Sequence, residues 1–231
     1  MNCNMWIILL SLFVFAKDIS GEVDCNKHFF ENCQRPKLFE EIPIEVNVFK
    51  ALCPELSSYI ICLRDYDMKC EAEDNRIFAN PERYVKLVDV FNEICEEGSV
   101  LNEVATGNLK CFNETFSHTN CEQERKTFLE PYEKEVPLDE FTTTHVIPER
   151  VHCLSEILLA NCLLEDITRN CGLRARYATV EYLQRSSFVD GSCPLSYRES
   201  LLPALDEFNL TEEQKTFAIA ELERMSLSDD K

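Results

Sequence analysis

The chain has 231 residues, of which 45% are hydrophobic and 28% charged, and its formal net charge at neutral pH is −19. A field of that sign repels nucleic acid and anionic membrane surfaces, so the charge argues against those partners and favours solubility or a cationic partner. The chain holds only five glycines, which argues for helices rather than a turn-rich β-scaffold.

The first segment of the chain has the features of a secretory signal peptide. No charged side chain occurs in the first sixteen residues, and the stretch from Trp6 to Ala16 is apolar apart from Ser11. Such a run is too short to span a bilayer but has the length of a signal-peptide core. Residues 1–16 are therefore predicted to be cleaved, with cleavage after Gly21 as the alternative. Nothing later is expected to be apolar enough to enter a membrane, so the mature chain is predicted to be soluble and extracellular.

Cleavage would remove Cys3 and leave twelve of the thirteen cysteines, an even number. In an oxidising compartment such cysteines form disulfides that persist. A zinc cluster would need closely spaced pairs of the Cys-x-x-Cys kind, and the sequence has none. We therefore predict six disulfides, with no metal site and no cofactor. The predicted pairing set is Cys25, Cys33, Cys53, Cys62, Cys70, Cys95, Cys111, Cys121, Cys153, Cys162, Cys171 and Cys193.

The spacing of these cysteines repeats. The gaps after Cys53 are eight, seven and twenty-four residues, and the gaps after Cys153 are eight, eight and twenty-one. Two further cysteines precede each set of four. The pattern predicts two tandem helical units of six cysteines each, over residues 22–105 and 106–200, followed by a C-terminal helix and tail over 201–231.

Apolar residues at three- and four-residue spacing predict the helices of the first unit. A short helix is expected between Cys25 and Cys33, ended by Pro36, while an extended link is as consistent with residues 38–49 as a helix is. The next helix is predicted to begin at Pro54 and end near residue 65, with Cys70 in the turn beyond it. Another should begin at Asn80-Pro81 and stop near Gly98.

The second unit repeats these signals with different residues. Residues 130–149 are acidic and contain three prolines, which predicts an exposed connector. Pro148 should open a helix that carries Cys162, and a second helix is expected from about Leu173 to Gln184. A capping box at Thr211 and Gln214 predicts the last helix, with an apolar side of Phe217, Ala218, Leu222 and Met225. The fold class is therefore all-α, with little or no sheet.

Helix geometry limits the disulfide pairing. Cysteines eight or nine residues apart on one helix lie roughly 12–13.5 Å apart, whereas a disulfide tolerates at most about 7 Å between Cα atoms. Cys153 therefore cannot pair with Cys162, nor Cys25 with Cys33, and the bridges must join different elements. The remaining connectivity stays open, with fifteen possibilities for six cysteines.

No catalytic residue is predicted. The four histidines, His28, His118, His145 and His152, lie in no metal or catalytic motif, and Gly-x-Ser-x-Gly is absent from the sequence. His152 precedes Cys153, but a cysteine in a disulfide is no nucleophile. Two sequons predict N-glycosylation at Asn113 and Asn209, with Asn113 favoured because a loop is expected there.

The Cys-Pro-x-Leu stretch at Cys53, with Cys62-Leu63, Cys70 and the Cys-Glu-Glu-Gly-Ser-Val-Leu stretch from Cys95 to Leu101, resembles a group of arthropod secreted cysteine-rich proteins. They occur in haemolymph, saliva and venom glands. The resemblance covers the first unit, and it extends to the second only through the cysteine spacing. It implies an extracellular fluid or a venom as the setting and supplies no catalytic residues.

These observations lead to two hypotheses about function. The first is a secreted, non-enzymatic protein that acts by binding a protein target. The second is an extracellular carrier of a small hydrophobic ligand, because a bundle of aromatic-rich helices can enclose an apolar pocket. An enzyme is disfavoured, since nothing supplies the nucleophile, base and oxyanion donors that an active site requires.

Overall fold

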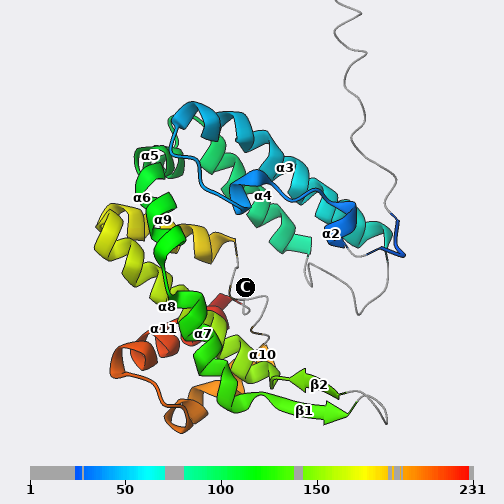
Figure 1. Ribbon diagram of the computed structural model, residues 1–231, viewed down its shortest axis with the longest axis vertical. Helices are drawn as coiled ribbons and strands as arrows, with labels where there is room; N and C mark the ends of the chain where they lie inside the picture. Colours follow the sequence, from blue (N-terminus) through cyan, green and yellow to red (C-terminus); the bar gives the residue numbers. More distant parts are fainter. Residues whose placement is uncertain are drawn as a thin grey trace, which may run out of the picture.

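A computed structural model of the chain describes residues 24–27, 29–70, 81–137, 143–186, 189, 193 and 195–228. The predicted signal peptide and its cleavage positions lie outside these residues, as does His28. The fold is all-α, as predicted, with one small hairpin (Figure 1). Two helices of more than twenty residues, α3 (Val46–Lys69) and α8 (Glu149–Cys171), form the centres of two halves of the chain, the first ending with α5 at Gly107 and the second beginning with α6 at Leu109. The shorter elements of the first half are α2 (Phe29–Asn32), η1 (Lys37–Phe39), α4 (Pro81–Cys95) and α5 (Val100–Gly107).

The first long helix, α3 (Val46–Lys69), begins eight residues earlier than predicted. Pro54 lies inside the helix and does not begin it, and the first turn is formed by residues 46–49, the end of the segment for which a link and a helix were equally consistent. Tertiary packing explains the difference, because Phe49 and Cys53 are buried against Leu109 of a later helix. Burial of an aromatic side chain compensates for the backbone hydrogen bond that a proline removes.

Helix α4 runs beside α3 and matches its sequence prediction closely (Figure 1). It begins at Pro81 and ends at Cys95, and Gly98 follows with a φ of +89°, a conformation that glycine adopts without steric cost. Ser99 then caps α5, since its hydroxyl oxygen accepts a hydrogen bond from the Asn102 N–H at 3.0 Å.

Two helices that the cysteine pattern did not resolve follow, α6 (Leu109–His118) and α7 (Cys121–Leu129). They lead to the second long helix, α8 (Glu149–Cys171), which Pro148 precedes as predicted. Gly172, at φ +84° and ψ 177°, turns the chain into α9 (Leu173–Arg185), within one residue of the expected end.

The described part of the predicted exposed connector contains regular secondary structure. It contains a short 3₁₀ helix, η3 (Glu130–Tyr132), and two antiparallel strands, β1 (Lys134–Pro137) and β2 (Thr143–Val146), paired from Lys134 opposite Val146. The hairpin projects from the end of the molecule at which α8 begins (Figure 1). Strands of four residues show too little alternation of apolar and polar side chains to be predicted from a sequence segment that also contains three prolines.

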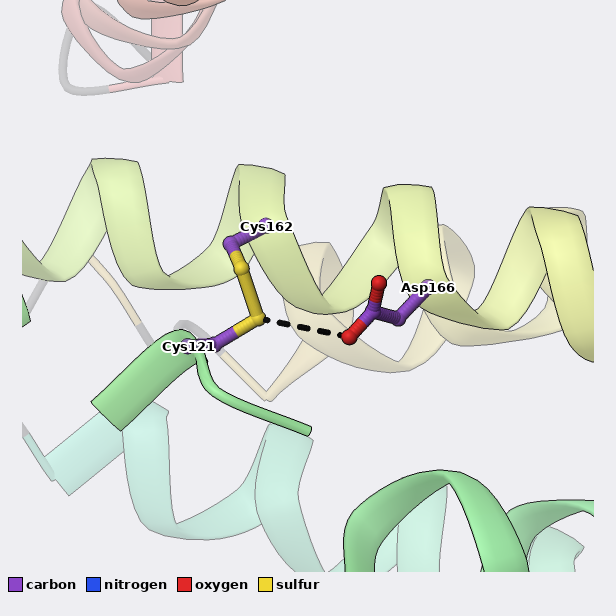
Figure 2. A group of neighbouring side chains, drawn as sticks. All are labelled: Cys121, Cys162 and Asp166. Atoms are coloured by element: carbon purple, nitrogen blue, oxygen red, sulfur yellow. Dashed lines mark hydrogen bonds between the residues drawn. A yellow bond between two sulfur atoms is a disulfide. The ribbon is translucent and has the colours of Figure 1, made fainter. Parts of the chain in front are cut away.

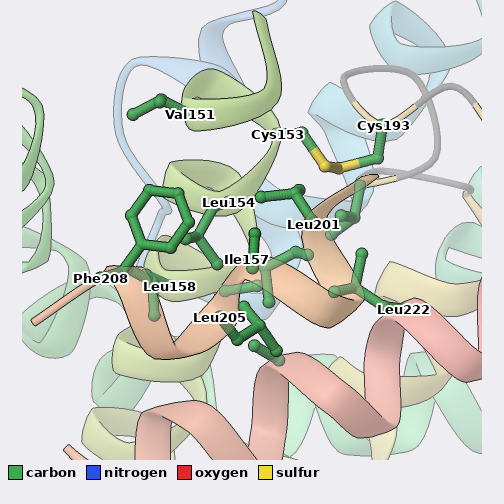
Figure 3. Close-up of a cluster of buried hydrophobic side chains, with 14 of the residues drawn as sticks. Val151, Cys153, Leu154, Ile157, Leu158, Cys193, Leu201, Leu205, Phe208 and Leu222 are labelled. Atoms are coloured by element: carbon green, nitrogen blue, oxygen red, sulfur yellow. A yellow bond between two sulfur atoms is a disulfide. The ribbon is translucent and has the colours of Figure 1, made fainter. Parts of the chain in front are cut away.

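The C-terminal part packs against the second half of the chain. Helix α10 (Leu195–Leu201) continues into η4 (Leu202–Glu207), and α11 (Glu212–Ser228) lies against α8. Figure 3 shows the shared cluster, in which Leu154, Ile157, Leu201, Leu222 and the neighbouring side chains interdigitate. Ala218, Leu222 and Met225 are fully buried, as their periodicity predicted, while Phe217 packs at the margin. Residues beyond 200 thus share the hydrophobic core of α8.

All twelve cysteines of the predicted set are paired, and the two sets have the same connectivity. In each, the first cysteine pairs with the fifth, the second with the fourth and the third with the sixth. The Cα atoms of each pair lie 4.8–5.7 Å apart. The pairs are Cys25–Cys70, Cys33–Cys62, Cys53–Cys95, Cys111–Cys171, Cys121–Cys162 and Cys153–Cys193. Helix α8 therefore carries one partner of all three bridges of its half, whereas α3 carries Cys53 and Cys62 and its C-cap residue is Cys70.

Among the described helices, α3 alone is long and apolar enough to cross a membrane by length and composition. On this criterion, the prediction that no segment after the signal peptide is apolar enough to enter a membrane was wrong. The fold gives the apolar side chains another role, because Leu56, Ile60 and Leu63 are buried in the core of the first half. Three disulfides also fasten α3, or its C-cap Cys70, to neighbouring elements.

Candidate functional site: an apolar cavity between the two halves

Three groups of residues have side chains that could form a functional site, and the histidines are the first. His118 closes α6, where its ring Nδ1 lies 2.7 Å from the Glu114 carbonyl oxygen of the same helix. His152 is on α8 with its Nε2 4.0 Å from Glu156. His145 lies on β2, and nothing is described of its side chain. Both described histidine side chains are exposed and make local contacts within their own helices.

The second group is Cys121, Cys162 and Asp166, whose donor atoms lie within 4.8 Å of one another (Figure 2). That spacing suits a metal ion, but the two sulfurs are joined in a disulfide and are not the thiolates that a metal needs. The Asp166 carboxylate accepts a hydrogen bond from Thr119 Oγ1 at 2.7 Å and pairs with Arg169 at 3.0 Å. This group therefore fastens the start of α7 to α8.

The third group forms a cavity of about 340 Å³ between the two halves of the chain. Small-molecule sites in proteins typically measure roughly 300–1,000 Å³, so the space is sufficient for a small organic ligand. Twenty residues line it, and eighteen of them have hydrocarbon side chains. A cavity of this composition does not hold ordered water well, because a buried water needs two to four polar partners.

Elements of the first half build one wall of the cavity. Leu38 and Phe39 come from η1, Phe49 and Leu56 from α3, and Phe91 from α4. Leu56 and Phe91 also belong to the hydrophobic core cluster of the first half, so one face of this core serves partly as a cavity wall. Phe39 is 38% exposed and packs edge-on against the ring of Tyr59, with centroids 5.7 Å apart.

Elements of the second half build the opposite wall. Phe112 and Phe116 of α6 stack with ring centroids 6.4 Å apart, and Phe116 remains 44% exposed. Helix α8 contributes Leu163 and Ile167, and α9 contributes Tyr182 among others. Helix α5 lies between the walls, with Leu101 and Val104 lining the cavity.

Polar contacts near the cavity join the two halves. Asn113 Nδ2 on α6 donates a hydrogen bond of 2.6 Å to the carbonyl oxygen of Ile42, which is itself a lining residue. The Arg185 guanidinium on α9 forms an ion pair with Glu93 on α4, and both side chains are about one-third exposed. These contacts connect elements more than seventy residues apart in the sequence and hold the walls together.

The structure contradicts the loop that was expected at Asn113, the first of the two sequons. Asn113 lies within α6 and not in a loop, its side-chain nitrogen is engaged with Ile42, and Thr115 of the sequon is 2% exposed. Asn209 is exposed in the link between η4 and α11. The capping box follows it as predicted, since the Thr211 hydroxyl oxygen accepts from the Gln214 N–H and the Gln214 side chain accepts from the Thr211 N–H.

The sequence indicated a pocket only in general terms. It predicted the helices that carry Phe91 and Tyr182, but nothing in the sequence indicated that these residues line a common cavity. The chain matches no protein-family model, no curated protein and no solved structure, so the interpretation of the cavity rests on its own geometry.

Proposed function

We propose that this protein is a secreted, non-enzymatic carrier that binds a small hydrophobic ligand in the cavity between its two halves. The observation that supports the proposal is the composition of the walls, in which eighteen of twenty lining side chains are hydrocarbon. Of the two functions that the sequence left open, the geometry favours the carrier over a protein that acts only through its surface.

The energetics of ligand transfer support the same choice. Moving apolar surface from water into an apolar site gains roughly 25 cal/mol per Å². An apolar molecule of about 200 Å² would therefore gain on the order of 5 kcal/mol before the cost of association is subtracted. Because the walls are fixed by disulfide-bonded helices, little additional ordering is needed on binding.

An extracellular fluid is the proposed setting. The six intramolecular disulfides suggest an extracellular protein, since such bonds persist in oxidising compartments. The N-terminal apolar run supports secretion, the exposed sequon at Asn209 supports glycosylation, and the resemblance to arthropod secreted proteins supports haemolymph, saliva or venom. The net charge of −19 keeps such a carrier soluble and gives no attraction to nucleic acid or anionic membranes.

The first experiment measures binding of a fluorescent apolar probe, N-phenyl-1-naphthylamine, whose emission rises on transfer into a dry site. Ala178 lines the cavity, so Ala178→Phe fills part of it and should weaken probe binding at least tenfold. Ala51 is exposed on α3 and does not line the cavity, so Ala51→Phe is the matched control and should bind the probe as the wild type does.

Native mass spectrometry of the protein from its source provides a second readout, because a bound lipid adds mass that denaturation removes. Absence of probe binding to the wild-type protein, together with absence of a co-purified ligand, would overturn the carrier proposal. Equal weakening by both alanine variants would show that the probe binds elsewhere, with the same consequence.

A further inference from the structure

Only two of the cavity-lining residues, Thr179 and Tyr182, have polar groups in their side chains. Both lie on α9, and they differ in their hydrogen bonding. The Thr179 hydroxyl donates to the carbonyl oxygen of Ala175 at 2.9 Å, within its own helix. The Tyr182 hydroxyl has no hydrogen-bond partner within the described part of the chain. This hydroxyl is not among the fully buried polar atoms that lack a partner, so a ligand can reach it and replace water as its hydrogen-bond partner.

Tyr182 is held in place by the first half of the chain. Its ring packs against the cluster formed by α3 and α4, with its centroid 6.1 Å from that of Phe91. Arg185, one turn later on α9, pairs with Glu93 of α4 and fixes the helix against that surface. The ring therefore has a defined position between the two walls, which suits a group that orients a ligand.

The protonation state of this hydroxyl suits a donor. Burial raises the pKa of the Tyr182 hydroxyl above its ordinary value of 10.0, because the phenolate would be poorly solvated there. At neutral pH the group stays protonated, so it donates one hydrogen bond and accepts others.

The walls also restrict the charge of a ligand. None of the twenty lining residues is charged, and the guanidinium of Arg185 is already engaged by Glu93 and Glu181. Burying an isolated carboxylate or ammonium group without a partner is far more costly than burying a hydroxyl that forms one hydrogen bond. A fatty acid with its carboxylate inside the cavity is therefore a poor fit.

We infer that the ligand is an uncharged hydrophobic molecule with a single hydroxyl or carbonyl group, and that Tyr182 binds this group inside the cavity. This inference rests on the proposed carrier function and specifies the ligand class, a neutral lipid alcohol, ketone or ester. Tyr182 acts as the polar anchor. The hydrocarbon walls supply the remaining affinity and discriminate little between ligands of different shape.

The test uses three probes of similar size, 1-dodecanol, tridecane and dodecanoate, each competing with N-phenyl-1-naphthylamine at pH 7.4. For the wild type, 1-dodecanol should bind more tightly than dodecanoate. Tyr182→Phe removes only the hydroxyl, so it should weaken 1-dodecanol binding roughly three- to tenfold and narrow the difference between the alcohol and the alkane. The matched control is Tyr177→Phe, on the same helix at a side chain that is 68% exposed and outside the cavity.

The outcomes separate the two proposals. If the fluorescent probe and tridecane bind but Tyr182→Phe leaves 1-dodecanol affinity unchanged, the anchor is wrong and the carrier function stands. If dodecanoate binds as tightly as the alcohol, the uncharged ligand class is wrong. If no probe binds to the wild type, the carrier function itself fails. A crystal structure with 1-dodecanol should place its oxygen within hydrogen-bond distance of Tyr182.

Discussion

At the scale of single residues, the environment of a side chain determines what its chemistry can do. Asn113 and Asn209 carry the same sequon, yet one nitrogen is engaged in a contact between the two halves and the other is exposed. Cys121 and Cys162 lie close enough to Asp166 for a metal site, yet their sulfurs are bonded to each other. In both cases the residue type is necessary for the modification or for metal binding, and the contacts of the side chain decide whether it can take part.

The two sequons yield the first prediction. Asn209 should carry a glycan in the secreted protein and Asn113 should not, because a glycan on Nδ2 of Asn113 would displace its hydrogen bond to Ile42. The measurement is peptide mass spectrometry after enzymatic release of N-glycans in heavy-oxygen water, which marks each former glycosylation site. The Asn209→Gln variant should run faster on a gel and Asn113→Gln should not. A marked Asn113 would contradict the prediction.

The second prediction concerns pH and the two ion pairs of Arg125, one with Glu122 within α7 and one with Glu156 of α8. Arg125 donates to both carboxylate oxygens of Glu122, at 2.9 and 2.8 Å, and to Glu156 at 2.9 Å. The hydrogen bonds from Arg125 lower the pKa of Glu122 below its ordinary value of 4.5. A lowered pKa stabilises the fold above the unfolded-state value, and this contribution is lost as pH falls through the folded-state value.

Glu122→Gln should therefore lower the free energy of unfolding at pH 7 by about 0.5 kcal/mol, a small effect because the Glu122 side chain is half exposed. The difference from wild type should shrink as pH falls below 4.5. Denaturant titrations at several pH values measure it, with Glu96→Gln at an exposed position as control. A difference that grows towards acid pH would show that the sign is wrong.

At the scale of secondary-structure elements, the links between helices matter as much as the helices. The connection from α8 to α9 consists of Gly172 alone, and both helices line the cavity. Its backbone, at φ +84° and ψ 177°, lies in a region that is nearly restricted to glycine. A side chain added there would meet no atom within 4 Å, so any cost of substitution comes from the backbone.

The third prediction follows from that geometry. Gly172→Ala should lower the free energy of unfolding by about 1–3 kcal/mol, because alanine is strained at this φ and ψ. Gly107 in α5 is the matched control, since it also has open space around it and lies in a helix. Gly107→Ala should be neutral or stabilising by up to about 1 kcal/mol. Thermal unfolding of both variants decides the matter, and equal midpoints would contradict the strain argument.

At the scale of the whole molecule, identical connectivity in the two cysteine sets supports the interpretation of the chain as a tandem repeat. The halves nevertheless differ in what surrounds the long helix. Helix α3 packs mainly on α4, whereas α8 is covered by α6, α7, α9, α10 and α11. The cavity belongs to neither half alone, so the repeat creates a site that a single unit would lack.

The fourth prediction compares equivalent bridges in the two halves. The Cys33–Cys62 bridge closes a loop of 29 residues and the Cys121–Cys162 bridge a loop of 41. Loop-closure entropy assigns each roughly 3–4 kcal/mol. Replacing both cysteines of either pair by alanine should therefore lower the thermal midpoint by several degrees, to a similar extent in the two variants.

The wild-type control for this comparison is alkylation with iodoacetamide under denaturing, non-reducing conditions, which should add no mass because all twelve cysteines are bonded. Modification of two or more cysteines would mean that the pairing is incomplete. An unchanged thermal midpoint in either double variant would show that its bridge does not stabilise the fold.

The sequence by itself determined the features that depend on residues close to one another along the chain. The apolar stripe of α4, the glycine after it, the start of α8 at Pro148 and the capping box of α11 are such features. Each depends on helical periodicity or on end-capping chemistry, which acts over three or four residues. The cysteine spacing likewise predicted which residues are bridged, and helix geometry excluded two of the pairings.

Only the tertiary structure decided the rest. The pairing of the cysteines, the position of Pro54 inside α3 and the environment of Asn113 all depend on elements distant in the sequence. The cavity is the clearest case, because Phe39 and Tyr182 line the same space although 143 positions separate them. An apolar stripe packs against whatever surface reaches it, so local sequence cannot distinguish a filled core from a cavity wall. That distinction depends on how closely the two halves approach, which the packing of the whole chain sets.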